Sequence, residues 1–156
     1  LGMQLMAIEF ARNVGGLEGA NSTEFDKNTP YPIVNMMESQ KKILNLGGTM
    51  RLGAQKTIIE KGTLLSEIYK SQRVVYERHR HRYEVDADAY PQLFKKPGEG
   101  GYKLTISARS DFVEAIELDN HPFFVGIQYH PEYKTKVGAP HPLFKALVEV
   151  AGGKRI

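Results

Sequence analysis

The sequence predicts an α/β domain with a central, largely parallel sheet. Residues 123–129 are almost all apolar, and several are aromatic or β-branched, which is typical of a strand buried on both faces in the middle of such a sheet. Residues 1–14 carry apolar side chains at helical spacing and predict an amphipathic helix. A second helix is expected from about Pro142, because proline is favoured in the first turn of a helix.

Composition and charge narrow the class of protein. The chain has 156 residues, of which 41% are hydrophobic and 25% charged, as expected for one globular domain. A net charge of +3 is too small to indicate nucleic-acid binding by itself, and no apolar run is long enough to span a membrane. The chain contains no cysteine, so it cannot form disulfides or thiolate metal sites from its own residues.

Turn and strand signals divide the middle of the chain. We expect Gly15 and Gly16 to end the first helix, and residues 33–34 to begin an edge strand. A short helix is predicted at residues 64–69, with Thr63 as its N-cap. Further strands are predicted at residues 55–60, 102–108 and 112–118. The predicted buried side of the last helix consists of Leu143, Phe144, Leu147, Val148 and Val150.

The strongest catalytic signal follows the predicted buried strand. Pro131 cannot donate to a β-ladder, so the strand should end there, with His130 and Glu132 just past its carboxyl end. A histidine beside a carboxylate can act as a general base that the carboxylate orients. Such a pair needs a nucleophile, but the chain has no cysteine and none of its Ser or Thr residues sits on an obvious elbow.

Residues 77–85, with alternating Arg and His, form the most basic run in the chain. A nucleic-acid patch is disfavoured because the run is short and has one aromatic residue. His79 and His81 would face the same way on a strand, but third and fourth zinc ligands are not evident, so no metal site is predicted. Arginines facing a pocket could bind carboxylates, although spacing alone favours a solvated strand face.

Two other segments are weaker candidates. Residues 47–53 contain three glycines and could cradle a phosphate, but they lack the Gly-Lys-Ser/Thr ending of a P-loop, which favours a simple loop before a strand. Residues 21–26 are polar and turn-like, and spacing alone makes Glu24 a solvated loop carboxylate.

Taken together, several motifs resemble one family. They are Leu-Gly-Met-Gln at residues 1–4, Asn-Ser-Thr-Glu-Phe at 21–25, Gly-Thr-Met-Arg-Leu-Gly at 48–53, the basic run at 77–85 and Gln-Tyr-His-Pro-Glu at 128–132. In this order they resemble the glutaminase domains of the CTP synthases, over nearly the whole chain. The His-Pro-Glu motif alone would fit any class I, triad-type glutamine amidotransferase.

The resemblance implies a doubly wound, flavodoxin-like fold and a partial domain at residues 1–156. In this family a cysteine nucleophile lies on a Gly-x-Cys-x-Gly elbow, and Leu1 and Gly2 match the half that follows the cysteine. We therefore expect the nucleophile immediately before Leu1, truncated, mutated or covalently modified. The earlier strands and the glycine-rich oxyanion loop are expected before it.

The resemblance also implies roles for individual residues. His130 would be the acid and base, Glu132 would orient it, and Arg51 would contribute to the site for the activator GTP. The residues expected to bind glutamine are Leu1, Gly2, Met3, Gln4, Glu24 and Arg82. Arg82 suits the α-carboxylate of glutamine and Glu24 its α-ammonium group.

For the intact protein, the resemblance implies a wider role. Ammonia from L-glutamine would pass to an amidoligase domain that uses ATP and Mg²⁺ to convert UTP to CTP. This domain would need no cofactor, and the intact protein would be a cytoplasmic homo-oligomer, a tetramer. The alternatives are another class I amidotransferase, a γ-glutamyl hydrolase, or a non-catalytic pseudo-glutaminase. The motifs at residues 21–25 and 77–85 favour the CTP synthases over the first two.

Overall fold

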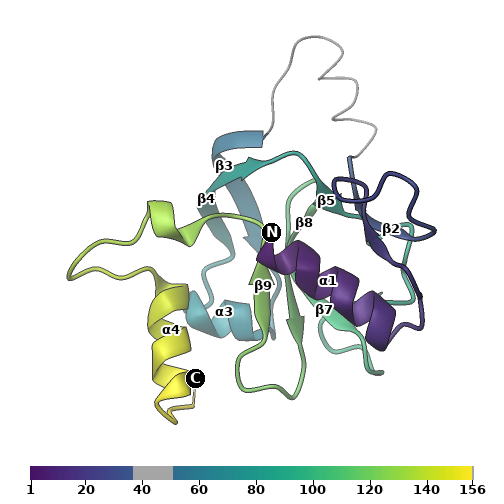
Figure 1. The fold of residues 1–156 in the computed structure, drawn as a ribbon. Coiled ribbons are helices and arrows are strands. Elements are labelled where there is room, and N and C mark those ends of the chain that lie inside the picture. The colour runs from purple at the N-terminus through teal and green to yellow at the C-terminus, as the bar shows by residue number, and fades with distance from the viewer. Residues whose placement is uncertain (37–50, 156) are drawn as a thin grey trace.

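The computed structural model describes residues 1–36 and 51–155 (Figure 1). In this part of the chain helices and strands are mixed, as expected for the α/β class, and the described strands form two sheets. The glycine-rich segment predicted at residues 47–53 lies outside the described residues except for its last three, which begin a strand.

The larger sheet has the order β4-β3-β7-β8-β9, and β6 pairs with β7. Its strands are β3 (Arg51–Ile59), β4 (Val74–His81), β6 (Phe94–Lys95), β7 (Leu104–Arg109), β8 (Val113–Leu118) and β9 (Val125–Ile127). The predicted strands at 55–60, 102–108 and 112–118 are thus confirmed. The ladders differ from the largely parallel sheet we expected, because within the described residues only β6–β7 is parallel in this sheet. Short connections such as the turn between β7 and β8 can join only antiparallel neighbours.

The strand at residues 123–129 also differs from its prediction. Only Val125–Ile127 is a strand, it pairs antiparallel with β8, and among the described strands it has no second neighbour. Val125 and Ile127 are half-buried instead of fully buried. The strand ends at Ile127, before the predicted stop at Pro131, and Pro131 begins the 3₁₀ turn η1 (Pro131–Tyr133).

The smaller sheet has three strands in the order β1-β2-β5. They are β1 (Asn21–Ser22), β2 (Pro32–Asn35) and β5 (Glu84–Val85). The expected edge strand at residues 33–34 is therefore central, because β2 pairs parallel with β1 and antiparallel with β5. Ile33 and Val34 are fully buried as a result.

Helix α1 (Gly2–Asn13) confirms the predicted N-terminal helix and contacts both β9 and the smaller sheet. It ends before Gly15, and Gly16 adopts a left-handed backbone conformation with φ of 67°. Gly126 of β9 lets the helix come close, since a Cβ there would lie 2.7 Å from Met6 Sδ and 3.1 Å from Met3 Cα. The amino end of α1 therefore lies beside the segment that leaves β9 (Figure 1).

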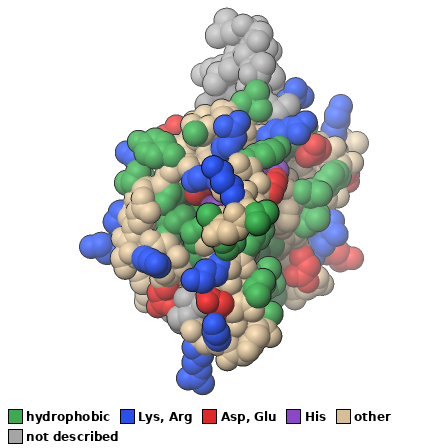
Figure 2. Space-filling view, turned by 90° about the vertical axis from the view of Figure 1, so that its left-hand side faces the viewer, with side chains coloured by type: hydrophobic (Ala, Val, Ile, Leu, Met, Phe, Trp, Pro, Cys, Tyr) green, Lys and Arg blue, Asp and Glu red, His purple; other side chains and the backbone are tan. Residues whose placement is uncertain are grey.

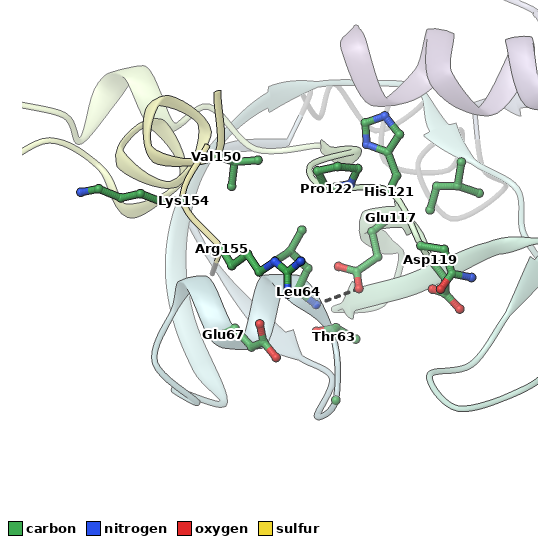
Figure 3. Close-up of a pocket in the computed structure, with 13 residues that line it drawn as sticks. Thr63, Leu64, Glu67, Glu117, Asp119, His121, Pro122, Val150, Lys154 and Arg155 are labelled. Atoms are coloured by element: carbon green, nitrogen blue, oxygen red, sulfur yellow. Dashed lines mark hydrogen bonds between the residues drawn. The ribbon is translucent and has the colours of Figure 1, made fainter. Parts of the chain in front are cut away.

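Helix α3 (Leu64–Ile68) begins at the predicted N-cap. Thr63 Oγ1 accepts a hydrogen bond from the Ser66 amide. The Glu117 carboxylate accepts from the amides of Leu64 and Leu65, and Figure 3 shows it pointing at the start of the helix. Glu117 is thus a buried β8 residue with a structural role in capping α3.

Helix α4 (Pro142–Ala151) starts at the predicted proline, but its predicted buried side is only partly right. Leu143 and Ala146 are buried, whereas Phe144, Leu147 and Val148 are 36%, 48% and 72% exposed. Of the described elements, α3 is the main contact of α4, so one narrow stripe of the helix has a partner. On the face that carries α4, hydrophobic side chains lie among lysines and arginines (Figure 2).

The described helices are all too short or too polar to cross a membrane.

Gly126→Ala tests the close contact between α1 and β9. The added methyl group would overlap Met6 and the backbone of α1, so we expect a loss of about 1–3 kcal/mol in the free energy of unfolding, measured by urea denaturation. Gly100→Ala is the control, because a Cβ at Gly100 meets no atom within 4 Å. Equal unfolding midpoints for the two variants would contradict the packing described above.

Candidate active site

The His130–Glu132 pair predicted from the sequence is formed. Nδ1 of His130 lies 2.6 Å from Oε1 of Glu132, and the two side chains are 31% and 51% exposed. Burial tends to raise the pKa of Glu132, but hydrogen bonds from its own backbone amide and from His130 lower it below its usual value. Glu132 is therefore ionised at neutral pH and holds a proton on Nδ1, which leaves Nε2 of His130 available to accept another proton.

The turn that carries this pair is anchored to strand β4. The backbone amide of His130 donates to the carbonyl of Arg78 at 2.9 Å. Lys134 Nζ donates to the buried carboxylate of Glu77 at 2.9 Å and to the carbonyl of Tyr76 at 2.8 Å. The imidazole of His130 is thus held at a fixed place relative to β4.

A pocket of about 760 Å³ opens in front of His130 and brings together six of the predicted site residues. They are Leu1, Gln4, Glu24, Arg82, His130 and Glu132. The two other residues predicted to bind glutamine do not line it: Met3 is 1% exposed and packs in the core, and a Cβ at Gly2 would meet no atom within 4 Å. The pocket therefore joins the amino end of α1, the loop after β1 and the segment before β5 to the His130 turn.

The backbone at Arg82 is held through the next residue, Tyr83. The side-chain amides of Gln4 and Gln128 both donate to the carbonyl of Tyr83, at 3.0 Å and 2.7 Å. Within the described residues, no ion pair or side-chain hydrogen bond engages the charged groups of Arg82 or Glu24. A cation and a carboxylate at the rim of the pocket are thus both available to a ligand.

A buried polar cluster lies beside the pocket. Arg51 of β3 donates to Glu114 of β8 at 2.8 Å and to Glu84 of β5 at 3.2 Å, and both carboxylates are fully buried. Nδ1 of His79 lies 2.9 Å from Nε2 of His81 and 3.6 Å from Oε2 of Glu114. Sequence reasoning missed Gln128, Glu84 and Glu114 as parts of this region. The available signals were Glu114 in a mostly apolar strand segment and Glu84 near the end of the basic run.

Burial controls the charges in this cluster. It raises the pKa of Glu84 to about 7, an effect that Arg51 opposes and Glu114 enhances. It lowers the pKa of His79 to about 4 and that of His81 to about 3, and the charge of Arg51 lowers both further. Both imidazoles are therefore neutral at pH 7.

The GTP contact of Arg51 stays a prediction. The side chain of Arg51 is 16% exposed, and its guanidinium contacts Glu84, Ser110 and Glu114. In this arrangement the donors of Arg51 are engaged with residues of the protein itself.

Comparison with known proteins identifies the family. The model for class I glutamine amidotransferases matches residues 1–150. The chain belongs to this family. Its fold is accordingly the class I amidotransferase fold, with mixed sheets in the described part.

Curated relatives of this amidotransferase chain are CTP synthases. It is 85% identical to the CTP synthase of Thermosipho africanus over 154 residues, and 67% identical to that of Thermotoga maritima over 155 residues. These matches cover 99% of this chain but 29% and 30% of the relatives, so it spans less than a third of their length.

A solved structure gives the same fold. The glutaminase domain of Trypanosoma brucei CTPS with bound acivicin matches with a TM-score of 0.86 and 36% identity. The match covers 99% of this chain and 59% of the Trypanosoma chain.

Lys134→Met tests the anchor of the His130 turn. Methionine keeps the length of the side chain but removes both hydrogen bonds to β4. We expect a loss of about 1–2 kcal/mol in the free energy of unfolding, because the Lys134 side chain is 40% exposed and solvent weakens the ion pair. We also expect faster hydrogen exchange of the His130 amide, measured by NMR.

The pH dependence of this effect follows from Glu77. Burial tends to raise the pKa of Glu77, but hydrogen bonds from His141 and Lys134 outweigh it and lower the pKa below 4.5. Stability from the Lys134 pair is present above the unfolded-state pKa and is lost as pH falls through the folded-state pKa. The difference between parent and variant should therefore shrink in acid. Lys136→Met, at a neighbouring exposed lysine, is the control. If Lys134→Met left the free energy of unfolding unchanged, the turn would be held by other contacts.

Proposed function

We propose that this domain hydrolyses the side-chain amide of L-glutamine to give glutamate and ammonia. The observation that carries the proposal is the position of the His130–Glu132 pair, which opens into the same pocket as the amino end of α1 and the charged side chains of Glu24 and Arg82. A base, a helix N-terminus and a matched pair of charges suit acyl transfer from an amino-acid side chain.

The proposed nucleophile is a cysteine that directly precedes Leu1 in the intact polypeptide. Its thiolate attacks the amide carbon, and the amide oxygen becomes an oxyanion that accepts a hydrogen bond from the Leu1 amide. His130, which has taken the proton of the cysteine thiol, gives that proton to the leaving nitrogen, so that ammonia departs and a thioester remains. Water then attacks the thioester while His130 takes its proton, which yields glutamate and restores the thiolate. Glu132 holds the imidazole in the tautomer that both steps need.

Glutamine recognition follows from charge and position. Arg82 can form two parallel hydrogen bonds with the α-carboxylate, and Glu24 can pair with the α-ammonium group. Gln4 of α1 and Leu1, which directly precedes the helix, line the same pocket as these charges and His130. A substrate held at its α-carbon in this way presents its side-chain amide to the nucleophile.

The high identity to CTP synthases supports a place in a larger enzyme. We propose that the intact polypeptide carries an amidoligase domain that uses the ammonia, with ATP and Mg²⁺, to convert UTP to CTP. GTP would be its activator, and a cytoplasmic tetramer its working form. The acivicin bound to the Trypanosoma domain supports a site for glutamine-like amino acids in this fold.

His130→Ala separates the two reactions of the proposed enzyme. In the intact protein, glutamine-dependent CTP formation should fall by orders of magnitude, because removing a triad member removes nucleophile activation. CTP formation from ammonium chloride should continue. Glu132→Ala should show the same split with a smaller loss. If a folded His130→Ala protein also lost the ammonia-dependent reaction, the assignment of His130 to ammonia release would be wrong.

Arg82→Ala tests recognition of the substrate. The KM for glutamine should rise about 30-fold, which corresponds to about 2 kcal/mol for losing one partner of a charge pair. Arg82→Lys should rescue only part of this loss because lysine lacks the planar fork. Arg73→Ala, at an exposed arginine away from the pocket, is the matched control. An unchanged KM for glutamine in Arg82→Ala would mean that Arg82 does not bind the substrate and that the basic run is a solvated strand face.

A further inference from the structure

Two histidines and a glutamate converge inside the larger sheet, beside the pocket. His79 and His81 project from the same face of β4, and Glu114 comes from β8. One ligand atom from each residue lies within 4.8 Å of the others, and this is the only such group of three or more found in the described residues. His79 and Glu114 are fully buried, and the side chain of His81 is 8% exposed.

The distances between these atoms suit a small metal ion. A tetrahedral ion with bonds of about 2.0–2.2 Å to nitrogen and oxygen holds its ligand atoms roughly 3.3–3.5 Å apart. The separations here are 2.9 Å for His79 Nδ1 to His81 Nε2, and 3.6 Å for His79 Nδ1 to Glu114 Oε2. These two separations differ from that range by a few tenths of an ångström, and one ligand atom from each of the three residues lies within 4.8 Å of the others.

A buried carboxylate oxygen in this group has no hydrogen-bond donor. Glu114 Oε2 is buried and has no hydrogen-bond partner, although its other oxygen accepts from Arg51 and Ser110. A buried carboxylate oxygen without a donor is costly, and a cation would satisfy it. The Arg51 and Ser110 contacts hold the carboxylate with its free oxygen turned toward His79.

The surroundings of His81 resemble an outer coordination sphere. Nδ1 of His81 lies 3.3 Å from Glu84 Oε1 and 3.0 Å from Gln128 Nε2, while Nε2 faces His79. Carboxylates beside the second ring nitrogen commonly orient metal-binding histidines. Glu84 and Glu114 can supply two negative charges and Arg51 supplies one positive charge, so the cluster can present net negative charge to a cation.

We propose that His79, His81 and Glu114 form a binding site for a divalent transition-metal ion such as Zn²⁺. Two imidazoles and one carboxylate suit zinc, cobalt or ferrous iron, whereas Mg²⁺ and Ca²⁺ prefer ligands that are all oxygen. An ion here would tie β4 to β8 across the sheet, next to the wall of the pocket that His81 lines. This site is separate from the His130–Glu132 chemistry and does not depend on it.

Metal titration of the intact, metal-free polypeptide tests the proposal. Co²⁺ is added in the presence of excess Mg²⁺, its visible absorption is recorded, and bound Co²⁺ is then displaced with Zn²⁺ and counted by elemental analysis. Parent protein and His121→Gln, which alters an exposed histidine, should bind the same number of equivalents. His81→Gln and Glu114→Gln should bind one equivalent of Co²⁺ fewer, or bind that equivalent with an affinity lowered more than about 100-fold. Changing a residue of the outer coordination sphere lowers metal affinity by less than this.

Folding of each variant is checked by circular dichroism without metal. If Glu114→Gln does not fold, His81→Gln decides the question, because His81 is partly exposed and glutamine can keep a contact with Glu84. Equal cobalt binding by parent and His81→Gln would overturn the proposal, as would an absorption signal in the parent that excess Mg²⁺ abolishes. Loss of the signal in His81→Gln alone, with His121→Gln unchanged, would support it.

Discussion

The pocket depends on how residues 82–84 are held against the larger sheet. Gln4 of α1 and Gln128 at the end of β9 both donate to the carbonyl of Tyr83, and Gln128 and Arg51 also contact Glu84. These contacts come from different elements and meet on one short segment that begins β5. Because Arg82 lies directly before Tyr83, these hydrogen bonds hold the backbone from which the Arg82 side chain leaves, although neither Arg82 nor His130 makes them.

The buried charges beside the pocket join the two sheets, but burying them costs free energy of desolvation. Removing an arginine and two carboxylates from water costs several kcal/mol for each ion, and mutual attraction offsets this only when the geometry is good. Here Arg51 bridges β8 of the larger sheet and β5 of the smaller one, so it can satisfy both carboxylates from one position. The raised pKa of Glu84, about 7, indicates that the compensation at that residue is incomplete. Such a cluster fixes a particular arrangement of strands more than it adds to stability.

Much of the site could be predicted because its signals are local. Pro131 lacks an amide hydrogen, which predicted from sequence alone that His130 and Glu132 follow a strand end, although β9 already ends at Ile127. Helix α1 and the Thr63 cap were equally local, and both were predicted. The roles of Glu24 and Arg82 rested on family resemblance, because spacing alone made both of them solvated charges.

What the sequence did not reveal depends on pairing across the chain. The apolar run at residues 123–129 suggested a central strand. Which strands pair depends on how they are connected in the chain, and the hydrophobic pattern of one segment does not show this. Phe144, Leu147 and Val148 looked like the buried side of a helix, yet burial needs a partner, and α3 covers a narrower stripe. Glu114 could not be predicted as part of the proposed metal site from the sequence, because it lies near His79 only when β8 and β4 are part of the same sheet.

The most direct test of the central claim is to locate the nucleophile of the intact protein. A reactive glutamine analogue is added, the protein is digested, and the modified peptide is mapped by mass spectrometry. We predict a single adduct on a cysteine joined to the amino end of Leu1, blocked by excess L-glutamine. An adduct on another residue, or no adduct in a folded protein, would contradict the assignment of this pocket as a glutaminase site.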